Sequence, residues 1–498
     1  MNNITQQKYT DILETLSHLS SDEVFTPPDV ANEILDLLPE DVWTDPNIKI
    51  LDPCTKSGVF LREAAKRLMI GLKDQFKNED LLRKHIFKNM LYGVAITEIT
   101  SLISKRSLYY SKDASSQFSI IQFDSKEGNI RHRRVEHDFF ANKCRLCGAS
   151  EGELNRDESR ENYAYEFIHN DSILSEMKFD VIIGNPPYQL NDEGFGRSAS
   201  PIYHLFVEQA FRLKPRYVSM IIPSRWFTGG KGLNQFRKNM LNSKNFTNLV
   251  DFPNSSEVFP NVTIRGGVSY FLWDKNYEGK CEIKTMENKK ISGTSKRFLG
   301  EHGDVFIRFS EGVSVINKIK IQESEYLENQ VAARNPFGMA TNFYSYREYE
   351  SKGFLKLYRK KGESYVHPKF VVKNEDWIYK YKVLTLRSYG AGGNPPHYVT
   401  GKPLIAKPGE VCTETYLVCG VFDNLNDAED FANYLKTKFV RFLVYLNTPT
   451  QDINRGGFKF VPKYKNYKNL NDDKLFSKYK FSDEEIEFIN NLIKEMDD

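Results

Sequence analysis

Apolar positions in the first half of the chain follow two alternating spacings. Short runs of neighbouring apolar residues, typical of buried strands, are followed by stretches in which apolar residues recur every three or four positions, as on one face of a helix. Strands are predicted over residues 48–51, 91–96, 119–123, 179–184, 217–222, 248–252 and 267–273. Helices are predicted from about residue 27 to 38, over 60–72, up to about 108 and over 203–212. This alternation predicts an α/β fold, with a mainly parallel sheet and helices on both faces.

The start and end of this domain are marked by changes in the pattern. Thr26 can cap the first helix, and the two prolines that follow suit its first turn. Residues 1–24 are polar with a helical pattern, which predicts an N-terminal helical arm. The last predicted strand, at 267–273, is expected to run antiparallel at the sheet edge. The α/β domain is predicted to cover residues 25–290.

Three other segments depart from the alternation. Residues 124–166 are charged and form a predicted insertion, and residues 291–330 are interpreted as a bridge. Residues 331–498 are rich in Tyr, Phe, Lys and turn residues without long periodicity, and we expect a mixed α+β domain there. Near the end of the chain, Ser482 and Glu485 have the spacing of a capping box, which predicts a helix start.

The composition is that of a globular protein. The chain has 498 residues, 40% of them hydrophobic and 27% charged, which is enough for two or three domains with cores. No apolar run is long enough to span a bilayer, and the N-terminus lacks a signal-peptide pattern. Six cysteines over this length do not make a disulfide framework, so the reducing cytoplasm is the expected location.

Positive charge gathers in the last third of the chain although the net charge is only +3. Residues 352–407 hold twelve Lys or Arg against three acids, and residues 441–468 hold six against one. Two such blocks suit a polyanionic partner, although a solvated lysine-rich surface has the same composition.

The tetrapeptide Asn185-Pro186-Pro187-Tyr188 is the most informative motif. Two consecutive prolines cannot continue the preceding strand, so they stiffen the backbone at its carboxyl end, where α/β sheets place their chemistry. Asn185 and the Pro186 carbonyl can accept the N–H hydrogens of an exocyclic amine while Tyr188 stacks on its ring. The alternative interpretation is an Asn-Pro turn that only ends the strand.

A second motif, Asp52-Pro53 followed by Ser57-Gly58, joins the first strand to its helix. Gly58 allows backbone to approach a ligand closely, and the helix N-terminus favours a carboxylate. The spacing differs from that of a phosphate-binding loop and from a three-glycine dinucleotide fingerprint.

Together these segments resemble the motifs of amino-group DNA methyltransferases, and most closely the gamma-class adenine-N6 methylases of Eco57I-type restriction-modification systems. The resemblance rests on Phe25-Thr26-Pro27, the Asp52–Phe60 loop and the Asn185–Tyr188 segment, in that order. It implies a Rossmann-like, S-adenosylmethionine-dependent methyltransferase domain followed by a C-terminal target-recognition domain. The chain would then be a site-specific adenine-N6 DNA methyltransferase of a restriction-modification or phage-defence system.

The resemblance also assigns residues to the cofactor, S-adenosylmethionine. It places the Phe25–Pro27 segment over the cofactor and the Asp52–Gly58 loop, with Phe60, at its methionine end. Glu98 stands in for the ribose-binding acid, because the usual position holds Ala95. The residues expected at the cofactor's adenine are Asn170 and Asp171.

The implied reaction is direct transfer of a methyl group to an adenine amine. Hydrogen bonds from the amine to Asn185 and Pro186 favour a more tetrahedral nitrogen, whose lone pair points at the methyl sulfonium. The amine is out of reach inside a duplex, so the base must be flipped out and stacked on Tyr188. Rival interpretations are methylation of RNA bases or protein glutamine, and an inactive DNA-binding specificity subunit. Two departures from the family pattern motivate the inactive subunit: Lys56 replaces a glycine common in the first motif, and Ala95 occupies the usual acidic position.

Two further candidate sites follow from the sequence. Cys144 and Cys147 form half of a zinc-knuckle pattern, which a histidine among His132, His137 and His169 would complete; two reduced cysteines in a turn are the alternative.

In the basic C-terminal third, the candidates for contacting double-stranded DNA are Arg387, Arg455 and Lys459. No nuclease motif is recognised, so any cleavage is expected from a separate restriction endonuclease.

Overall fold

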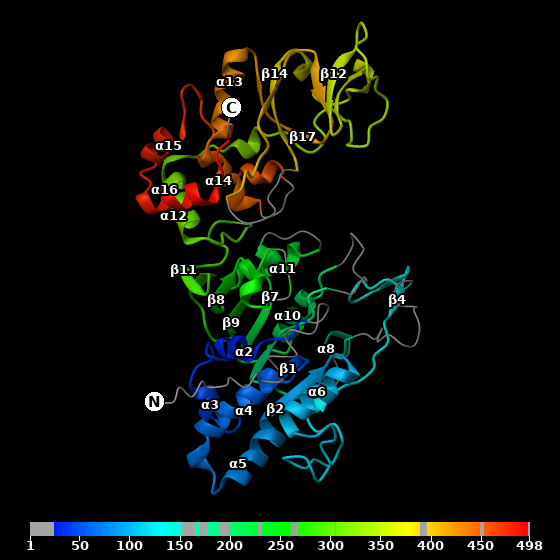
Figure 1. Ribbon diagram of the computed structural model, residues 1–498, viewed down its shortest axis with the longest axis vertical. Helices are drawn as coiled ribbons and strands as arrows, with labels where there is room; N and C mark the ends of the chain where they lie inside the picture. Colours follow the sequence, from blue (N-terminus) through cyan, green and yellow to red (C-terminus); the bar gives the residue numbers. More distant parts are fainter. Residues whose placement is uncertain are drawn as a thin grey trace, which may run out of the picture. The chain divides into compact units, whose positions relative to one another are not determined.

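The computed structural model describes most of the chain, which forms two compact units, Met1–Phe306 and Ile307–Asp498 (Figure 1). The described residues are 24–151, 165–169, 177–189, 200–227, 232–260, 262, 264, 266–303, 305–388, 396–448 and 453–496. The predicted arm over residues 1–24 therefore lies outside them, apart from Val24.

A nine-stranded sheet forms the centre of the first unit, in the order β11-β10-β8-β9-β7-β6-β1-β2-β3. Its strands are β1 (Ile50–Thr55), β2 (Leu91–Ala95), β3 (Ile130–Arg131), β6 (Val181–Gly184), β7 (Tyr217–Pro223), β8 (Phe246–Phe252), β9 (Val268–Asp274), β10 (Cys281–Glu287) and β11 (Lys290–Arg297). All neighbouring pairs are parallel except those made by β9 and β11. The strand predicted at 267–273 is thus antiparallel, but it lies inside the sheet because β8, β10 and β11 continue the sheet beyond it.

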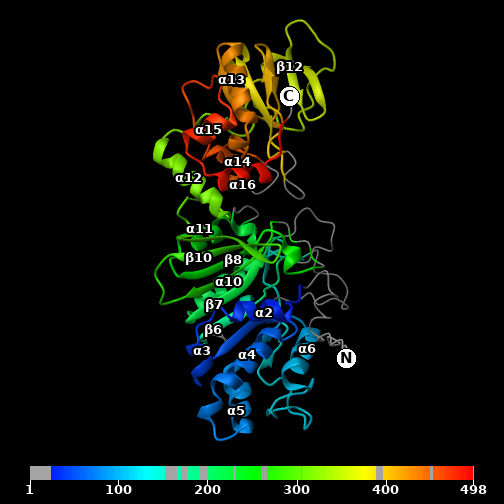
Figure 2. The same cartoon turned by 60° about the vertical axis from the view of Figure 1, so that its left-hand side comes forward.

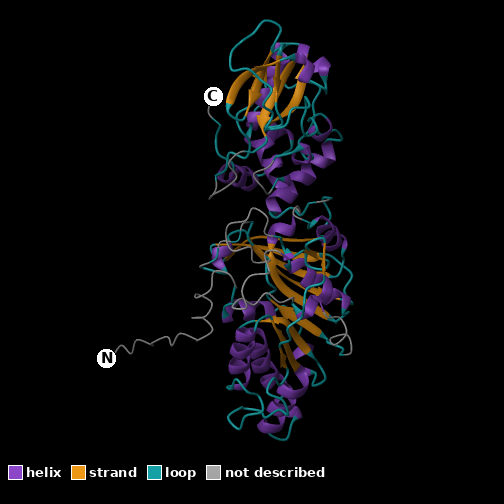
Figure 3. Cartoon of the chain, turned by 90° about the vertical axis from the view of Figure 1, so that its right-hand side faces the viewer, coloured by secondary structure: helices purple, strands orange, loops and turns teal. Residues whose placement is uncertain are grey.

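Successive side chains of the central strands enter two different hydrophobic clusters. In β6, Val181 and Ile183 belong to one cluster and Ile182 to the other, as the two-residue period of a strand requires. The first cluster includes side chains of α2 (Pro28–Leu35), α4 (Val59–Gly71) and α6 (Glu98–Tyr109), and the second those of α8 (Glu166–His169), α10 (Tyr203–Arg212) and α11 (Asn234–Asn242). Helices therefore cover both faces of the sheet (Figure 3), and the predicted α/β fold is confirmed.

One predicted strand is wrong. Residues 119–123 form an irregular, bent segment, in which the Ser119 hydroxyl donates to the Ile121 carbonyl at 2.6 Å. The third parallel strand is instead β3, which pairs with β2. Because β3 has only two residues, it is too short to produce an alternating pattern, and the insertion predicted over 124–166 includes it.

The second unit is a mixed α+β domain, as expected (Figure 2). It holds two three-stranded sheets, in the orders β13-β12-β16 and β15-β14-β17. The strands are β12 (Leu355–Arg359), β13 (Gly362–Val366), β14 (Tyr381–Leu386), β15 (Leu404–Ala406), β16 (Glu410–Cys412) and β17 (Tyr416–Phe422). The helices are α12 (Ser310–Gln322), α13 (Leu425–Lys436), α14 (Lys438–Asn447), α15 (Asp472–Lys478) and α16 (Asp483–Leu492). The capping box predicted at Ser482 and Glu485 is present at the start of α16.

Residues 291–330, predicted as a bridge, are divided between the two units. The strand β11 completes the sheet of the first unit, and α12 packs against α14 and α16 of the second. The boundary lies between Phe306 and Ile307.

Among the helices of the described residues, none is both long and apolar enough to cross a membrane.

Candidate active site

The Asn185–Tyr188 segment begins where β6 ends, beside the end of β1. Gly184 stands at this junction, and a Cβ atom there would lie 2.9 Å from both Asp52 Oδ1 and Cys54 Sγ. Only a glycine lets the two strand ends approach so closely. The fold therefore brings the segment predicted for catalysis next to the loop predicted for the cofactor.

Asn185 is buried and held by its amide nitrogen. Its Nδ2 donates to the Val24 carbonyl at 3.0 Å and to the Thr26 hydroxyl at 3.1 Å. Because a carbonyl can only accept, the amide atom that faces Val24 is the NH2 group. The Asn185 Oδ1 is also buried and has no hydrogen-bond partner within the described ranges. The side chain thus presents an unused acceptor at a fixed position.

Thr26 has a different role from the one predicted. Helix α2 begins at Pro28 with Pro27 as its N-cap, and no side chain caps it. A proline at the first helical position has no N–H group to satisfy, which lessens the need for a cap. The buried Thr26 hydroxyl instead accepts the hydrogen bond from Asn185. Phe25 is buried beside it.

In the loop after β1, the backbone at Gly58 lies close to a neighbouring element, helix α6. Gly58 has a φ of 75° and precedes α4, and no side chain caps that helix. A Cβ atom on Gly58 would lie 2.7 Å from Leu108 Cδ1 and 3.1 Å from Ser104 Cα, both on α6. The glycine therefore allows α4 and α6 to pack closely. It also leaves the first N–H groups of α4 without a side-chain cap, in a position suited to an anionic group.

Lys56 connects this loop to the N-terminal segment. Its side chain is buried, and its Nζ donates to the Val24 carbonyl at 3.0 Å, the same carbonyl that accepts from Asn185. Lys56 does not have a positive φ, so its position does not require a glycine. We call residues 24–27 the strap, because they are bonded to both loops.

The strap and the two loops surround a small pocket with a volume of about 10 Å³, which is room for roughly one water molecule. Its lining residues are Thr26, Asp52, Cys54, Lys56, Ser57, Gly58, Val59, Phe60 and Asn185. Five of the eleven residues that the resemblance assigns to the cofactor thus meet at one place, together with Asn185 of the segment predicted for catalysis. The five are Thr26, Asp52, Ser57, Gly58 and Phe60.

Burial controls the ionisation of the acidic groups in this pocket. It raises the pKa of the Asp52 carboxyl to about 6, against hydrogen bonds from Thr55 and Cys54 and the charge of Lys56. Burial also raises the pKa of the Cys54 thiol, so Cys54 remains a neutral packing residue. Asp52 is therefore the group of the pocket whose charge changes near neutral pH.

Tyr188 is the last residue of the segment predicted for catalysis. Its ring is half-buried and meets the Phe259 ring edge-on, with centroids 6.5 Å apart. Burial raises the pKa of its hydroxyl well above the ordinary value, with a smaller contribution from Cys54. The ring therefore remains neutral at any working pH.

The remaining cofactor candidates are not among the residues that line this pocket, or they lie outside the described residues. Glu98 is the first residue of α6, with its side chain 66% exposed and 3.8 Å from that of Arg134. Asn170 and Asp171 belong to the residues that the structure does not describe. Their assignment to the cofactor stays a prediction.

Among the DNA candidates, two lie on neighbouring segments. The Arg387 carbonyl accepts from the Ile453 backbone N–H at 2.7 Å, two residues before Arg455. Arg455 already donates from Nε to the Glu328 carbonyl at 2.8 Å. Lys459 follows at the end of the same short helix, Arg455–Phe458.

Some of the basic residues counted in the sequence support the fold. Arg441 is fully buried, and its guanidinium donates to the carbonyls of Lys436 and Lys494. Lys382 is buried and donates to the Lys407 carbonyl at 2.9 Å. The two basic blocks therefore offer a partner fewer charges than their composition indicates.

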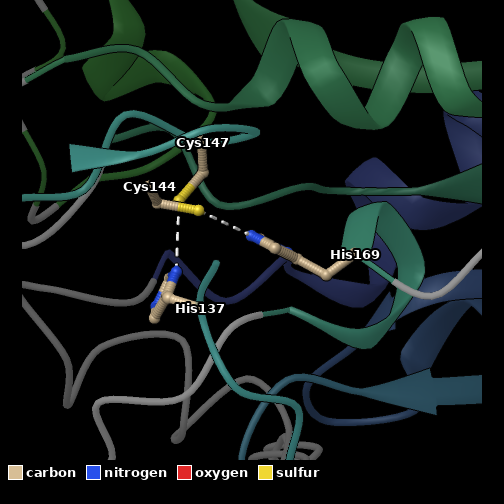
Figure 4. A group of neighbouring side chains, drawn as sticks. All are labelled: His137, Cys144, Cys147 and His169. Carbon is tan, nitrogen blue, oxygen red and sulfur yellow. Dashed lines mark hydrogen bonds between the residues drawn. The ribbon is translucent and has the colours of Figure 1, made fainter. Parts of the chain in front are cut away.

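The cysteines of the insertion lie beside two histidines. Cys144 Sγ is 3.6 Å from His169 Nε2, and Cys147 Sγ is 3.4 Å from His137 Nδ1 (Figure 4). The four atoms all lie within 4.8 Å of one another. His132, the third histidine predicted as a candidate, is not part of this cluster.

The sequence did not reveal two of the groups that organise the pocket. The first group is the Val24 backbone carbonyl, which accepts hydrogen bonds from Lys56 and Asn185. No pattern of side chains along the sequence can indicate a backbone acceptor. Gly184 looks like an ordinary end of a strand; its place directly before Asn185 was the signal that could have identified it.

Comparison with protein families and curated proteins gives consistent matches. The model of the Eco57I restriction-modification methylase family matches residues 89–259. An uncharacterised adenine-specific methylase of Mycoplasma pneumoniae is 37% identical over 314 residues, which are 57% of this chain and 74% of that protein. The type II restriction enzyme and methyltransferase RM.Eco57I of Escherichia coli is 25% identical over 220 residues, which are 38% of this chain but only 22% of that enzyme.

Among solved structures, the type IIL restriction-modification enzyme MmeI in complex with DNA aligns with a TM-score of 0.47 and 10% identity. The alignment covers 87% of this chain and 66% of that one.

Proposed function

This chain belongs to the Eco57I-type family of adenine-specific methylases, and on that premise we propose that it methylates the N6 amine of adenine in double-stranded DNA, with S-adenosylmethionine as the methyl donor. The observation that carries the proposal is the buried, unpaired Oδ1 of Asn185. A buried acceptor without a partner is costly in free energy, and the N–H of an adenine amine would satisfy it.

The pocket residues fit the methionine end of S-adenosylmethionine. The start of α4 at Gly58 offers backbone N–H groups to a carboxylate, and the ionised Asp52 offers a counter-charge to an ammonium group. The space that a Cβ on Gly58 would fill is taken up by α6, which keeps the loop tight. When bound, the cofactor supplies an electrophilic methyl group.

Asn185 orients the acceptor amine. Because two hydrogen bonds fix its NH2 group, its Oδ1 cannot rotate away, and it accepts one N–H hydrogen without reorganisation. We propose that the Pro186 carbonyl accepts the second hydrogen and that the neutral Tyr188 ring stacks on the flipped base. Lys56 and Asn185 share the Val24 carbonyl, so the strap holds the catalytic and cofactor loops at a fixed separation.

We propose that the second unit selects the DNA sequence, within residues 331–498. The basic segments around Arg387 and Arg455 support this, since they are neighbours in the fold. A restriction endonuclease on a separate chain would be the partner of the methylase.

Transfer of a tritiated methyl group from S-adenosylmethionine to duplex DNA tests the function, with mass spectrometry of the nucleosides to identify N6-methyladenine. Structured RNA and protein from the same cells serve as competing acceptors. Label in cytosine, RNA or glutamine in place of adenine would overturn the proposed substrate.

The affinity for S-adenosylmethionine is expected to fall as the pH drops through about 6, because the Asp52 carboxyl has a pKa of about 6 and must be ionised to pair with an ammonium group. The loss approaches tenfold per pH unit below that value. Calorimetric titrations from pH 5 to 7 measure it, and Asp52→Asn should show weak, pH-independent binding.

The expected loss of S-adenosylmethionine affinity would not be caused by unfolding of the protein when Asp52 is protonated. The folded pKa lies above the ordinary 3.8, so the folded state binds this proton more tightly, and the contribution of Asp52 to stability increases as the pH falls from about 6 to 4. A thermal melt at pH 5.5 that is no lower than the melt at pH 7 is the control. A flat affinity profile for the wild-type protein would rule out this role of Asp52.

Replacement of Tyr188 by Ala is expected to lower the methylation rate more than DNA affinity. Stacking on a base contributes about 1–3 kcal/mol, whereas phosphate contacts dominate DNA binding. Tyr188→Phe is the matched control and should retain activity, because the ring remains. The fluorescence of 2-aminopurine at the target position should rise on binding wild-type protein; an unchanged signal would mean that the base is not flipped.

A further inference from the structure

The insertion between β3 and α8 contains a hairpin that lacks a core of its own. The hairpin pairs β4 (Phe139–Phe140) with β5 (Lys143–Cys144) through a two-residue turn. Its large apolar side chains at Phe140 and Leu146 are 66% and 54% exposed. The hairpin is attached to the core of the first unit through Cys144, Cys147 and Ala149, and a metal cross-link at this point would fix its position further.

Two cysteines and two histidines converge at the base of this hairpin. Cys144 and Cys147 are buried, and the knuckle between them is closed by a hydrogen bond from the Gly148 N–H to the Cys144 carbonyl at 2.9 Å. His137 precedes β4, and His169 is the last residue of α8. In Figure 4 the four side chains point toward one centre from these separate segments.

The spacing of the ligand atoms matches a tetrahedral zinc ion. Bond lengths of about 2.3 Å to sulfur and 2.0–2.1 Å to nitrogen, at tetrahedral angles, separate a sulfur from a nitrogen by about 3.6 Å. The two sulfur–nitrogen distances, 3.6 Å for Cys144–His169 and 3.4 Å for Cys147–His137, agree with this value.

His169 makes a hydrogen bond with Nδ1, the ring nitrogen that does not face the cluster, as metal-binding histidines do. His169 Nδ1 lies 3.0 Å from the Tyr165 carbonyl, which can only accept. The proton is therefore on Nδ1, and the lone pair of Nε2 faces Cys144. Such a hydrogen bond to a backbone carbonyl fixes the tautomer and orientation of a metal-binding histidine.

We propose that His137, Cys144, Cys147 and His169 bind one structural Zn²⁺ ion that fastens the insertion to helix α8. Two thiolates and two imidazoles favour zinc, and four protein ligands leave no open coordination position for catalysis. Helix α8 is itself anchored in the domain. Phe167 stacks on Phe206 of α10 at 5.8 Å, and Glu166 pairs with Arg131 of β3 at 2.9 Å.

Elemental analysis of the full chain, purified without a histidine tag or chelator, is expected to find one zinc per chain. The double variant Cys144→Ser/Cys147→Ser and the single variant His137→Ala should each lose at least nine-tenths of it. His137→Cys should retain zinc, because three thiolates and one imidazole also suit this metal. His132→Ala is the matched control with unchanged zinc, since His132 is outside the cluster.

Two measurements on wild-type protein do not depend on the folding of variants. Replacement of zinc by Co²⁺ should give the visible absorption of a tetrahedral site with thiolate-to-metal charge transfer. Removal of the metal by a chelator should speed tryptic cleavage at Lys143 and Arg145 in the hairpin. Three results would each overturn the proposal. They are zinc-free protein that binds no added metal, a Cys144–Cys147 disulfide in freshly prepared protein, and an octahedral cobalt spectrum.

Discussion

Asn185→Ala is expected to reduce methylation by at least two to three orders of magnitude while leaving S-adenosylmethionine affinity within a few-fold of wild type. The variant removes the Asn185 Oδ1, which is a buried side-chain acceptor of the pocket without a hydrogen-bond partner in the described structure. Removal of one fixed hydrogen-bonding group from a transition state typically costs 10²–10³ in rate. The cofactor affinity is largely kept because the proposed cofactor contacts, at Asp52 and the start of α4, come from the other loop. Single-turnover methylation and calorimetry measure the two effects separately.

A graded series separates orientation from acceptance. Thr26→Val removes one of the two acceptors that hold the Asn185 NH2 group and keeps the side-chain volume. The Val24 carbonyl remains, so the rate should fall by about fivefold, the equivalent of one hydrogen bond of about 1 kcal/mol. If Asn185→Ala lost cofactor binding and methylation together, Asn185 would belong to the cofactor site, and the assigned role would be wrong.

The sequence predicted those parts of the site that depend on neighbours along the chain. Gly58 and the Asn185–Tyr188 segment both follow strands, β1 and β6, and short apolar runs identify strands well. Lys56 stood out only as a departure from the glycine of related sequences, and it raised the alternative of an inactive protein. The structure gives it a partner, the Val24 carbonyl, 32 positions away. A contact with a distant backbone carbonyl has no sequence signal.

Other errors have the same physical origin. The strand β3 is two residues long, so its place in the sheet is decided by pairing with β2 and not by its own pattern. The sequence also offered three histidines to complete the Cys144–Cys147 pair. The fold selects His137 and His169, since His169 is brought to the hairpin by α8. Ligands from separate elements meet only after the chain has folded.

Exchange of Ile307–Asp498 for the matching unit of a relative with another target is expected to transfer the relative's DNA sequence specificity. Specific sites are typically bound 10³–10⁷-fold more tightly than other DNA, so the original sequence should lose methylation almost completely. The junction between Phe306 and Ile307 preserves both cores, because Phe306 belongs to a cluster of the first unit and Ile307 to one of the second. Long-read sequencing of methylated DNA reads out the new target.

Point variants in the second unit test the same assignment at the level of single contacts. Arg387→Ala should relax specificity at one base pair, at a cost of about 1–3 kcal/mol, if its guanidinium reads a base edge. Lys459→Ala should weaken all sequences alike and reduce the salt slope of log K by about one, as expected for one phosphate contact. Arg441→Lys is the structural control: it should lower the melting temperature without changing the target, because Arg441 is buried among backbone carbonyls. A chimera that still methylates the original sequence would place recognition in the first unit, since the second unit would then contribute affinity alone.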